Sequence, residues 1–172
     1  RVGMTGDIKE AFVYALGNRT VRGLIIMSFI PVLFGYANFM LPAWAREALD
    51  VQSDGLGLLL MMFGVGALAG TLMLASMRHI NRAGAFLLTL AVAWGSLLTI
   101  FSQTTSYALA MPLILLIGLV SSIHISLNMT LLQVYTAPEM RGRIVSFGVM
   151  SFGLMPLSAV PFGVIAERVG TP

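Results

Sequence analysis

Long runs of apolar residues alternate with short polar segments along this chain. Three of these runs, at residues 23–45, 55–77 and 144–166, each hold 23 positions without an acidic or basic side chain. A helix of that length spans roughly 35 Å at about 1.5 Å per residue, which is enough to cross a hydrocarbon core of about 30 Å. We therefore predict a transmembrane helix in each of the three ranges.

A fourth run, residues 83–138, is too long for a single crossing. Over its 56 residues the only acidic, basic or imidazole side chain is that of His124. A polar cluster at residues 102–107 divides the run and predicts two further spans, at residues 83–101 and 108–134. A backbone in contact with lipid has to satisfy its own hydrogen bonds, so helices are expected. The predicted fold class is an all-α membrane protein with five transmembrane helices.

Composition supports this interpretation. Hydrophobic residues make up 58% of the 172 residues and charged residues 10%, and the mean hydropathy is +0.91. A soluble domain typically carries about 25% charged residues, so most of this surface is expected to contact a lipid bilayer. The basic residues do not cluster with stacking aromatic residues, so we predict no binding to nucleic acid. The chain has no cysteine, which excludes disulfides and thiolate metal sites.

Lysine and arginine are distributed unevenly between the two ends of the predicted helices. The segments on one side hold eight of them and those on the other side hold two: Arg1, Lys9, Arg19, Arg22, Arg78, Arg82, Arg141 and Arg143, against Arg46 and Arg168. Cytoplasmic loops carry the excess of basic residues in membrane proteins. The N-terminus is therefore predicted to be cytoplasmic, and the C-terminus to lie on the far side of the membrane.

The two ends of the chain are expected to lie outside the bilayer. Residues 1–22 are predicted to form a cytoplasmic amphipathic segment or linker. Within it, residues 7–16 can form a short helix that rests at the membrane surface, with one apolar face made of Ile8, Phe12, Ala15 and Leu16. Residues 167–172 are expected to form an extracytoplasmic turn toward a further helix. The chain is therefore interpreted as an excerpt from a longer protein.

Two of the predicted spans concentrate polar or helix-breaking residues on one face. In the first span these residues recur every three or four positions: Ser28, Pro31, Gly35, Asn38 and Pro42. They are consistent with a hinge and a cavity face, and equally with helix packing through small residues. In the fourth span, Ser121, His124 and Asn128 share one face. Because polar groups are costly in hydrocarbon, that helix is expected to be surrounded by protein or water.

The candidate substrate-binding residues follow from these two faces. They are Asn38, Ser121, His124 and Asn128, with Asn38 expected opposite the polar face of the fourth span across a central cavity. Tyr36 in the first span is a further candidate. His124 is a candidate for proton relay or ligand contact, and the alternative is a neutral histidine bonded to a neighbouring helix. The third span has no such face, and we expect it to face lipid, at Ala91 for example.

Glycine and proline mark the second and fifth spans. Gly66 and Gly70 form a Gly-x-x-x-Gly pair, which lets two helix backbones approach closely, and helix packing is its expected role. Pro156, Pro161 and Gly163 predict a bent and closely packed fifth helix.

No catalytic or metal-binding arrangement is found in the sequence. The predicted spans hold no Asp or Glu, no glycine-rich phosphate loop occurs, and neither histidine has further ligands at a metal-binding spacing. A Ser-His-Asp set would lack its buried acid. We predict that the protein is not an enzyme and uses neither a cofactor nor a metal.

The segment from Pro138 onward resembles a known family. It begins Pro138-Glu139-Met140-Arg141-Gly142-Arg143 and continues with Gly148, Pro156-Leu157 and the run Gly163-Val164-Ile165-Ala166-Glu167-Arg168 before Gly170. This pattern resembles the tenth-to-eleventh helix region of major facilitator superfamily exporters, in the branch that contains the enterobactin exporter and the macrolide-efflux proteins. Residues 6–22 are similar to that branch's entry into its seventh helix. The chain would then hold helices seven to eleven, in the C-terminal half.

The resemblance implies both a fold and a function. Such exporters have twelve helices in two six-helix halves that rock around a midplane site, so an N-terminal half would be the partner of this chain. Residues 138–143 would form a cytoplasmic loop in which Gly142 allows close passage while Arg141 and Arg143 bind carbonyl ends or acids. The implied function is secondary active efflux of an amphipathic small molecule, of the drug or siderophore class, by proton antiport across a bacterial inner membrane.

A second hypothesis is a non-transporting membrane scaffold or a subunit that anchors another protein. The two hypotheses differ in whether the helices have to move. The helix breakers at Pro31, Pro42, Pro156 and Pro161 favour the transporter, because a static anchor has no use for kinks.

Overall fold

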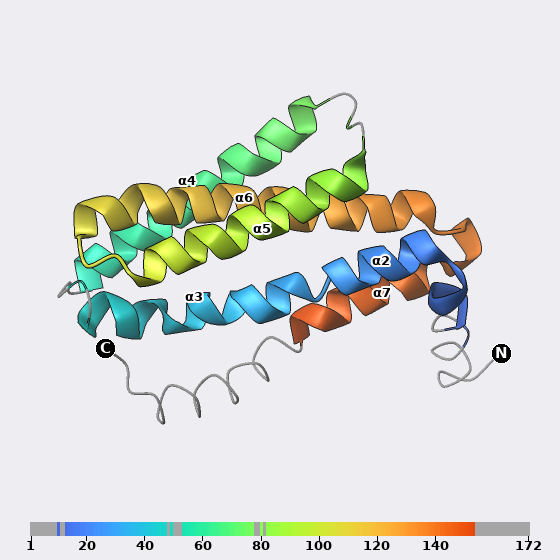
Figure 1. The fold of residues 1–172 in the computed structure, drawn as a ribbon, viewed down its shortest axis with the longest axis horizontal. Coiled ribbons are helices and arrows are strands. Elements are labelled where there is room, and N and C mark those ends of the chain that lie inside the picture. The colour runs from blue at the N-terminus through green and yellow to red at the C-terminus, as the bar shows by residue number, and fades with distance from the viewer. Residues whose placement is uncertain are drawn as a thin grey trace. The chain divides into compact units, whose positions relative to one another are not determined.

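A computed structural model describes residues 10, 13–47, 49, 53–77, 80 and 82–153, and all regular secondary structure in these ranges is helical (Figure 1). A helical turn at residues 13–17 comes first. The helices that follow are α2 (Arg19–Met27), α3 (Ile30–Glu47), α4 (Ser53–Ser76), α5 (Ala83–Ser102), α6 (Tyr107–Tyr135) and α7 (Pro138–Gly153). The chain divides into two compact units, one formed by residues 1–36 with 128–172 and the other by residues 37–127.

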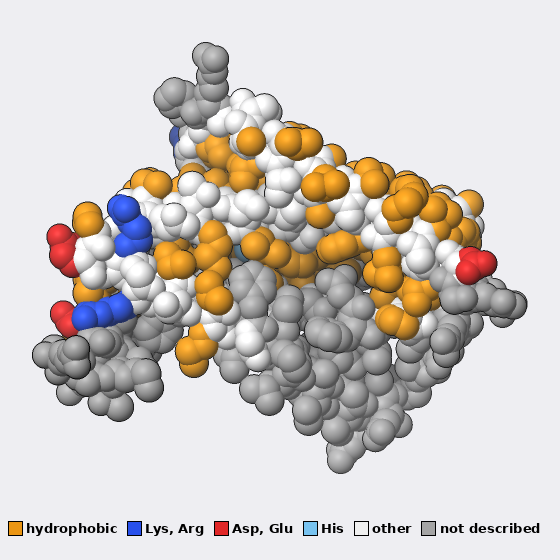
Figure 2. Space-filling view, turned by 180° about the vertical axis from the view of Figure 1, so that it is seen from behind, with side chains coloured by type: hydrophobic (Ala, Val, Ile, Leu, Met, Phe, Trp, Pro, Cys, Tyr) orange, Lys and Arg blue, Asp and Glu red, His pale blue; other side chains and the backbone are white. Residues whose placement is uncertain are grey.

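Three helices within the described ranges are long and apolar enough to cross a membrane. They are Asp54–Ser76, Ala83–Ser102 and Tyr107–Tyr135. Large apolar side chains are exposed along them, among them Leu72 at 71% and Leu109 at 61%, and Figure 2 shows hydrophobic side chains over long stretches of the visible surface. Such exposure suits contact with lipid, because soluble proteins rarely expose large apolar patches. The structure is that of an all-α membrane protein, and the total of five spans stays a prediction.

The first predicted span, residues 23–45, is not one continuous helix. α2 ends at Met27 and α3 begins at Ile30. The cause is Pro31, which has no N–H to donate to the carbonyl of Met27, so the helical hydrogen bond at this step is missing. Proline is tolerated in the first turn of a helix, and it therefore fits the start of α3. The single helix expected here is corrected to two helices with a break before Pro31.

This break predicts that Pro31→Ala joins α2 to α3. We expect stability to rise by about 1 kcal/mol, because the alanine N–H can restore the missing hydrogen bond to the carbonyl of Met27. With Pro31 in place, the backbone N–H of Phe29 donates to the carbonyl of Ile26 at 3.1 Å, and that of Val32 donates to the carbonyl of Phe29 at 3.0 Å. Each hydrogen bond joins residues three positions apart, where an α-helix joins residues four apart. Both amides should exchange hydrogen more slowly in the variant. Pro42→Ala, within α3, is the control, and unchanged exchange at Phe29 in Pro31→Ala would contradict the stated cause.

In the unit formed by residues 37–127, α4 and α6 approach each other closely through glycine. A Cβ atom on Gly66 would overlap the carbonyl oxygen of Leu115, and one on Gly118 would overlap that of Phe63. Gly70 of α4 is crowded by α6 in the same way. In lipid, helices associate through close packing of small residues, since no hydrophobic force acts between them. These glycines therefore hold α4 against α6.

The turn between α5 and α6 is anchored to other helices of the same unit. It covers residues 103–106, inside the polar cluster that divides the long apolar run. At its end, the hydroxyl of Tyr107 donates a hydrogen bond to the carbonyl of Gly55 at 3.0 Å. At its beginning, the ring of Phe101 lies 4.4 Å from that of Trp44. These contacts fix the end of α5 and the start of α6.

The third predicted span, residues 83–101, lies in α5 and does not face lipid at Ala91. Ala91 is 8% exposed and lies on a buried face with Leu87 and Trp94, whereas Val92 is 69% exposed. The expectation that Ala91 would be exposed is therefore wrong. A helix that is apolar all round gives no periodic signal of which face is buried.

The motif at residues 138–143 is helical and not a loop. α7 begins at Pro138, which suits the first helical position because its missing N–H is not needed there. Glu139 places a negative charge in the first turn, where the helix dipole favours it. The loop expected at residues 138–143 is therefore wrong, and the connection between α6 and α7 consists of Thr136 and Ala137. α7 starts before the predicted fifth span, and residues 154–166 of that span lie outside the described residues.

Candidate functional site

α6 buries the three polar residues of the predicted fourth-span face, Ser121, His124 and Asn128. Ser121 and Asn128 are each 3% exposed and His124 is 0% exposed. Their spacing places them on one face of the helix, which continues with the buried apolar residues Ile117 and Leu132. Buried polar groups need hydrogen-bond partners, and the three residues differ in the partners they have.

Ser121 is satisfied within its own helix, whereas Asn128 bonds to another. The Ser121 hydroxyl donates to the carbonyl of Gly118 at 3.1 Å. Asn128 Nδ2 donates to Ser28 Oγ at 2.7 Å, and Ser28 Oγ donates to the carbonyl of Leu24 at 3.1 Å. Ser28 is the C-cap of α2 and belongs to the same unit as Asn128. The buried amide of Asn128 is thus bonded through Nδ2 at the place where α2 ends, and its Oδ1 has no hydrogen-bond partner among the described residues.

His124 faces α5 in the unit formed by residues 37–127. Its ring centroid lies 6.0 Å from that of Trp94, with the two planes at 58°. Neither Nδ1 nor Nε2 has a hydrogen-bond partner among the residues that the structure describes. One interpretation of His124 was a neutral histidine hydrogen-bonded to a neighbouring helix. No such hydrogen bond is found among the described residues. Trp94 was missed from the sequence because it is one large residue in a uniformly apolar helix.

The other candidates are less completely described. Tyr36 and Asn38 lie in α3, with Gly35 and Pro42, and the side chains of Tyr36 and Asn38 are outside the described part of the chain. The expected position of Asn38 opposite Asn128 stays a prediction. Outside the described residues lie the candidates of the fifth span: Pro156, Pro161 and Gly163.

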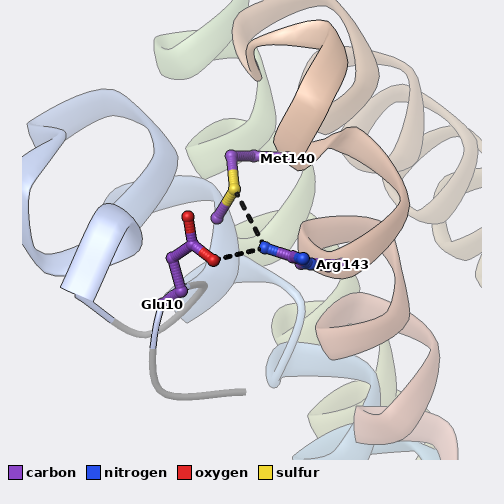
Figure 3. A network of polar contacts seen from close by, with 3 residues as sticks. All are labelled: Glu10, Met140 and Arg143. Carbon is purple, nitrogen blue, oxygen red and sulfur yellow. Dashed lines mark hydrogen bonds and ion pairs between the residues drawn. The ribbon is translucent and has the colours of Figure 1, made fainter. Parts of the chain in front are cut away.

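A second polar cluster joins the N-terminal segment to the start of α7 (Figure 3). Arg143 Nη1 donates to Glu10 Oε2 at 2.6 Å and to the sulfur of Met140 at 3.7 Å. The backbone N–H of Ala137 donates to the hydroxyl oxygen of Tyr14 at 3.1 Å. The Arg143 and Glu10 side chains are 35% and 59% exposed, so water screens the ion pair and its contribution is about 0–1 kcal/mol. The segment is held at two points, one of them an ion pair of modest strength.

The residues of the 138–143 motif differ in their environments. Arg143 pairs with Glu10, whereas Arg141 is exposed. A Cβ atom on Gly142 would meet nothing within 4 Å, so the close passage implied for Gly142 is not found among the described residues. Glu10 and Tyr14 were missed from the sequence because their partners lie 133 and 123 residues away. A single sequence carries no signal of such a pairing.

The ion pair predicts a local effect of mutation. Glu10→Gln or Arg143→Gln should speed hydrogen exchange in the helical turn at residues 13–17 by about fivefold at most, the factor for about 1 kcal/mol. The double variant should add little to either single one, because both remove the same contact. Arg141→Gln is the matched control. Equal acceleration in that control would mean that positive charge in general, and not the pair, holds the segment.

Apolar helices long enough to cross a bilayer, with polar residues buried on one face of α6, define the chain as a multi-pass membrane protein. Residues 1–172 match the family model MFS_3, described as transmembrane secretion effector. The chain therefore belongs to this family, and with it to the major facilitator superfamily. The family points to a transporter and not to an enzyme. No curated protein and no solved structure matches the chain.

Proposed function

We propose that the chain is the C-terminal part of a secondary active exporter, which moves an amphipathic small molecule of the drug or siderophore class out of a bacterial cell. Transport would proceed by alternating access and proton antiport, with the N-terminal half of the protein completing the substrate path. The observation that carries the proposal is the family match over residues 1–172. The resemblance of the segment after Pro138 supports the assignment to helices seven to eleven.

The buried polar face of α6 supports a substrate path along that helix. Polar side chains within membrane helices usually face the bundle interior or a water-filled cavity. We assign Ser121, His124 and Asn128 to the path in the complete transporter, with Tyr36 and Asn38 contributed by α3. The break before Pro31 would act as a hinge close to this path, since Asn128 bonds to Ser28 there.

The alternative is a scaffold or an anchoring subunit that does not transport. The glycine contacts between α4 and α6 suit such a module equally well, because they describe tight packing. The break between α2 and α3 and the buried polar groups of α6 favour the transporter. Both features are costly in lipid and bring no benefit to a static anchor.

Efflux from bacterial cells that make the full-length protein tests the proposal. The cells are loaded with ethidium, with a macrolide or with a catecholate siderophore, which are three amphipathic probes of the proposed classes. Cells with the transporter should lose at least one probe faster than cells without it, and a protonophore should remove the difference. Equal efflux of all three probes from both kinds of cell would contradict an exporter of these classes.

We further propose that the turn between α5 and α6 is extracytoplasmic and that the start of α7 is cytoplasmic, as the distribution of basic residues indicates. Thr105 and Glu139 are exposed at these two places. Single cysteines there, in a full-length protein without other cysteines, can be labelled with an impermeant thiol reagent. Thr105→Cys should react in intact cells and Glu139→Cys only after the membrane is opened. The reverse pattern would contradict the orientation.

A further inference from the structure

His124 is a fully buried ionisable residue that makes no hydrogen bond to the described part of the chain. It lies within α6, is 0% exposed, and neither ring nitrogen has a partner among the described residues. Most buried polar side chains are hydrogen-bonded, so an exception needs an explanation. An ionisable side chain inside a membrane span is also costly and is usually there for a function. These two facts single out His124 from the other polar residues of α6.

The surroundings of His124 suit a neutral imidazole. α5 packs against it at Trp94 and carries no titratable side chain. Ser121, one turn before it, donates its hydroxyl hydrogen to the backbone of α6. Among the described residues of this unit, charged side chains stand at helix ends, with Asp54 at the start of α4 and Arg82 before α5. An imidazolium would therefore lack a carboxylate beside it, and apolar surroundings strongly disfavour an unpaired charge.

The open hydrogen-bonding position of His124 suits a very small ligand. A neutral imidazole keeps one ring nitrogen as an acceptor with a free lone pair, and no described donor uses it here. A larger ligand would have to displace the Trp94 ring, which is itself 2% exposed. A proton binds to the lone pair without requiring additional volume.

We propose that His124 is a proton-binding site of the transporter, neutral while α5 and α6 are packed together at Trp94 and protonated when the two helices separate there. A proton from water forms an N–H bond on the imidazole, and the same bond breaks when the proton returns to water on the other side. No electrons are transferred. The inference rests on the proposed function and deepens it, because it assigns the coupling proton to a residue of this chain.

The proposal links protonation to helix movement in a defined direction. The charged imidazolium needs water, which the packed state excludes, so protonation and separation of α5 from α6 stabilise each other. A ligand shifts a conformational equilibrium only through its different affinity for the two states, and here the ligand is the proton. Lowering the pH should therefore raise the population in which the α5–α6 contact is open.

The first experiment measures protonation and opening without any substrate. The full-length protein in lipid nanodiscs is labelled with ¹⁵N-histidine, and the His124 signal is assigned by its loss in His124→Gln. That signal should change from neutral to charged as the pH is lowered from about 8 to about 4. A single cysteine at Leu90, which is 8% exposed on α5, should become more reactive toward a maleimide as the pH falls. Its rate is normalised to that of Thr105→Cys in the exposed turn.

The second experiment uses ethidium as the transport probe in proteoliposomes. In His124→Gln we expect loss of the net ethidium transport that a pH gradient drives in wild type. An unchanged thermal unfolding midpoint and unchanged elution on size exclusion show that the variant is folded.

The outcomes separate this inference from the proposed function. A His124 signal that stays neutral over the whole pH range overturns the inference, as does gradient-driven transport that is unchanged in His124→Gln. Equal pH dependence of labelling at Leu90→Cys with and without His124 overturns it as well. If wild type moves no ethidium but His124 titrates together with the labelling, the proton site stands and ethidium is excluded as a substrate.

Discussion

Replacing Gly66 by alanine should destabilise the protein by about 3 kcal/mol or more, at the upper end of the cost of overpacking a core. The added methyl group would overlap the carbonyl oxygen of Leu115 on α6. The obstacle is backbone and not the end of a flexible side chain, so relief requires α4 and α6 to move apart. Gly118→Ala should act in the same way from the other helix, because its methyl group would overlap the carbonyl of Phe63. The measurement is the thermal unfolding midpoint of the full-length protein in detergent.

Gly64→Ala is the matched control for this prediction. Gly64 lies two residues from Gly66 on the same helix, and a Cβ atom there would meet nothing within 4 Å. Alanine favours a helix by about 1 kcal/mol over glycine, so this variant should be as stable as wild type or slightly more stable. The double variant Gly66→Ala, Gly118→Ala should cost less than the sum of its parts, because either change alone separates the helices. Similar midpoints for Gly64→Ala and Gly66→Ala would refute the close approach.

Replacing Asn128 by tryptophan should abolish efflux by the full-length transporter. Asn128 is 3% exposed and donates a hydrogen bond to Ser28, so an indole has no room there while α6 is packed near the end of α2. If this face lines the substrate path, the added bulk obstructs it. Asn38→Trp tests the expected opposite wall independently. Asn128→Leu, which removes the polar group at similar volume, should lower efflux by about tenfold, the factor that corresponds to 1.4 kcal/mol.

The control for these variants is Val92→Trp on α5. Val92 is 69% exposed, so a bulky apolar side chain there should contact lipid and leave efflux unchanged. Ala91 cannot serve for this purpose, because it is buried. Membrane abundance and elution on size exclusion are matched before rates are compared, which separates obstruction from misfolding. Normal efflux in both Asn128→Trp and Asn38→Trp would place the substrate path elsewhere.

Local periodicity and the distribution of charged residues predicted the apolar helices, one turn and the residues that share a face of α6. Runs without charge marked the apolar helices α4, α5 and α6, and the polar residues at 102–107 marked the turn between the last two. The three-to-four-residue spacing of Ser121, His124 and Asn128 placed them on one face of α6, and this face is buried. A helical period fixes which side chains share a face whatever the helix packs against.

The features that could not be predicted depend on the partner of each helix. Pro31 interrupts the helix whereas Pro42 lies inside α3, because an interior proline is tolerated only where its surroundings satisfy the freed carbonyl. The buried face of α5 carries no polarity signal, and so Ala91 was misplaced. Gly118 is an isolated glycine, and its contact with Phe63 depends on the register between α4 and α6. Neither helix's own sequence contains that register.

The most direct test of the account is transport by the purified full-length protein in liposomes with an imposed pH gradient. A fluorescent dye inside the vesicles reports the internal pH while ethidium, a macrolide and a catecholate siderophore are offered in turn. We expect at least one of them to move against its concentration gradient, while protons move in the opposite direction in the same vesicles. If none of the probes moves and the pH gradient decays as in protein-free vesicles, the central claim of a proton-driven exporter for these compounds is contradicted.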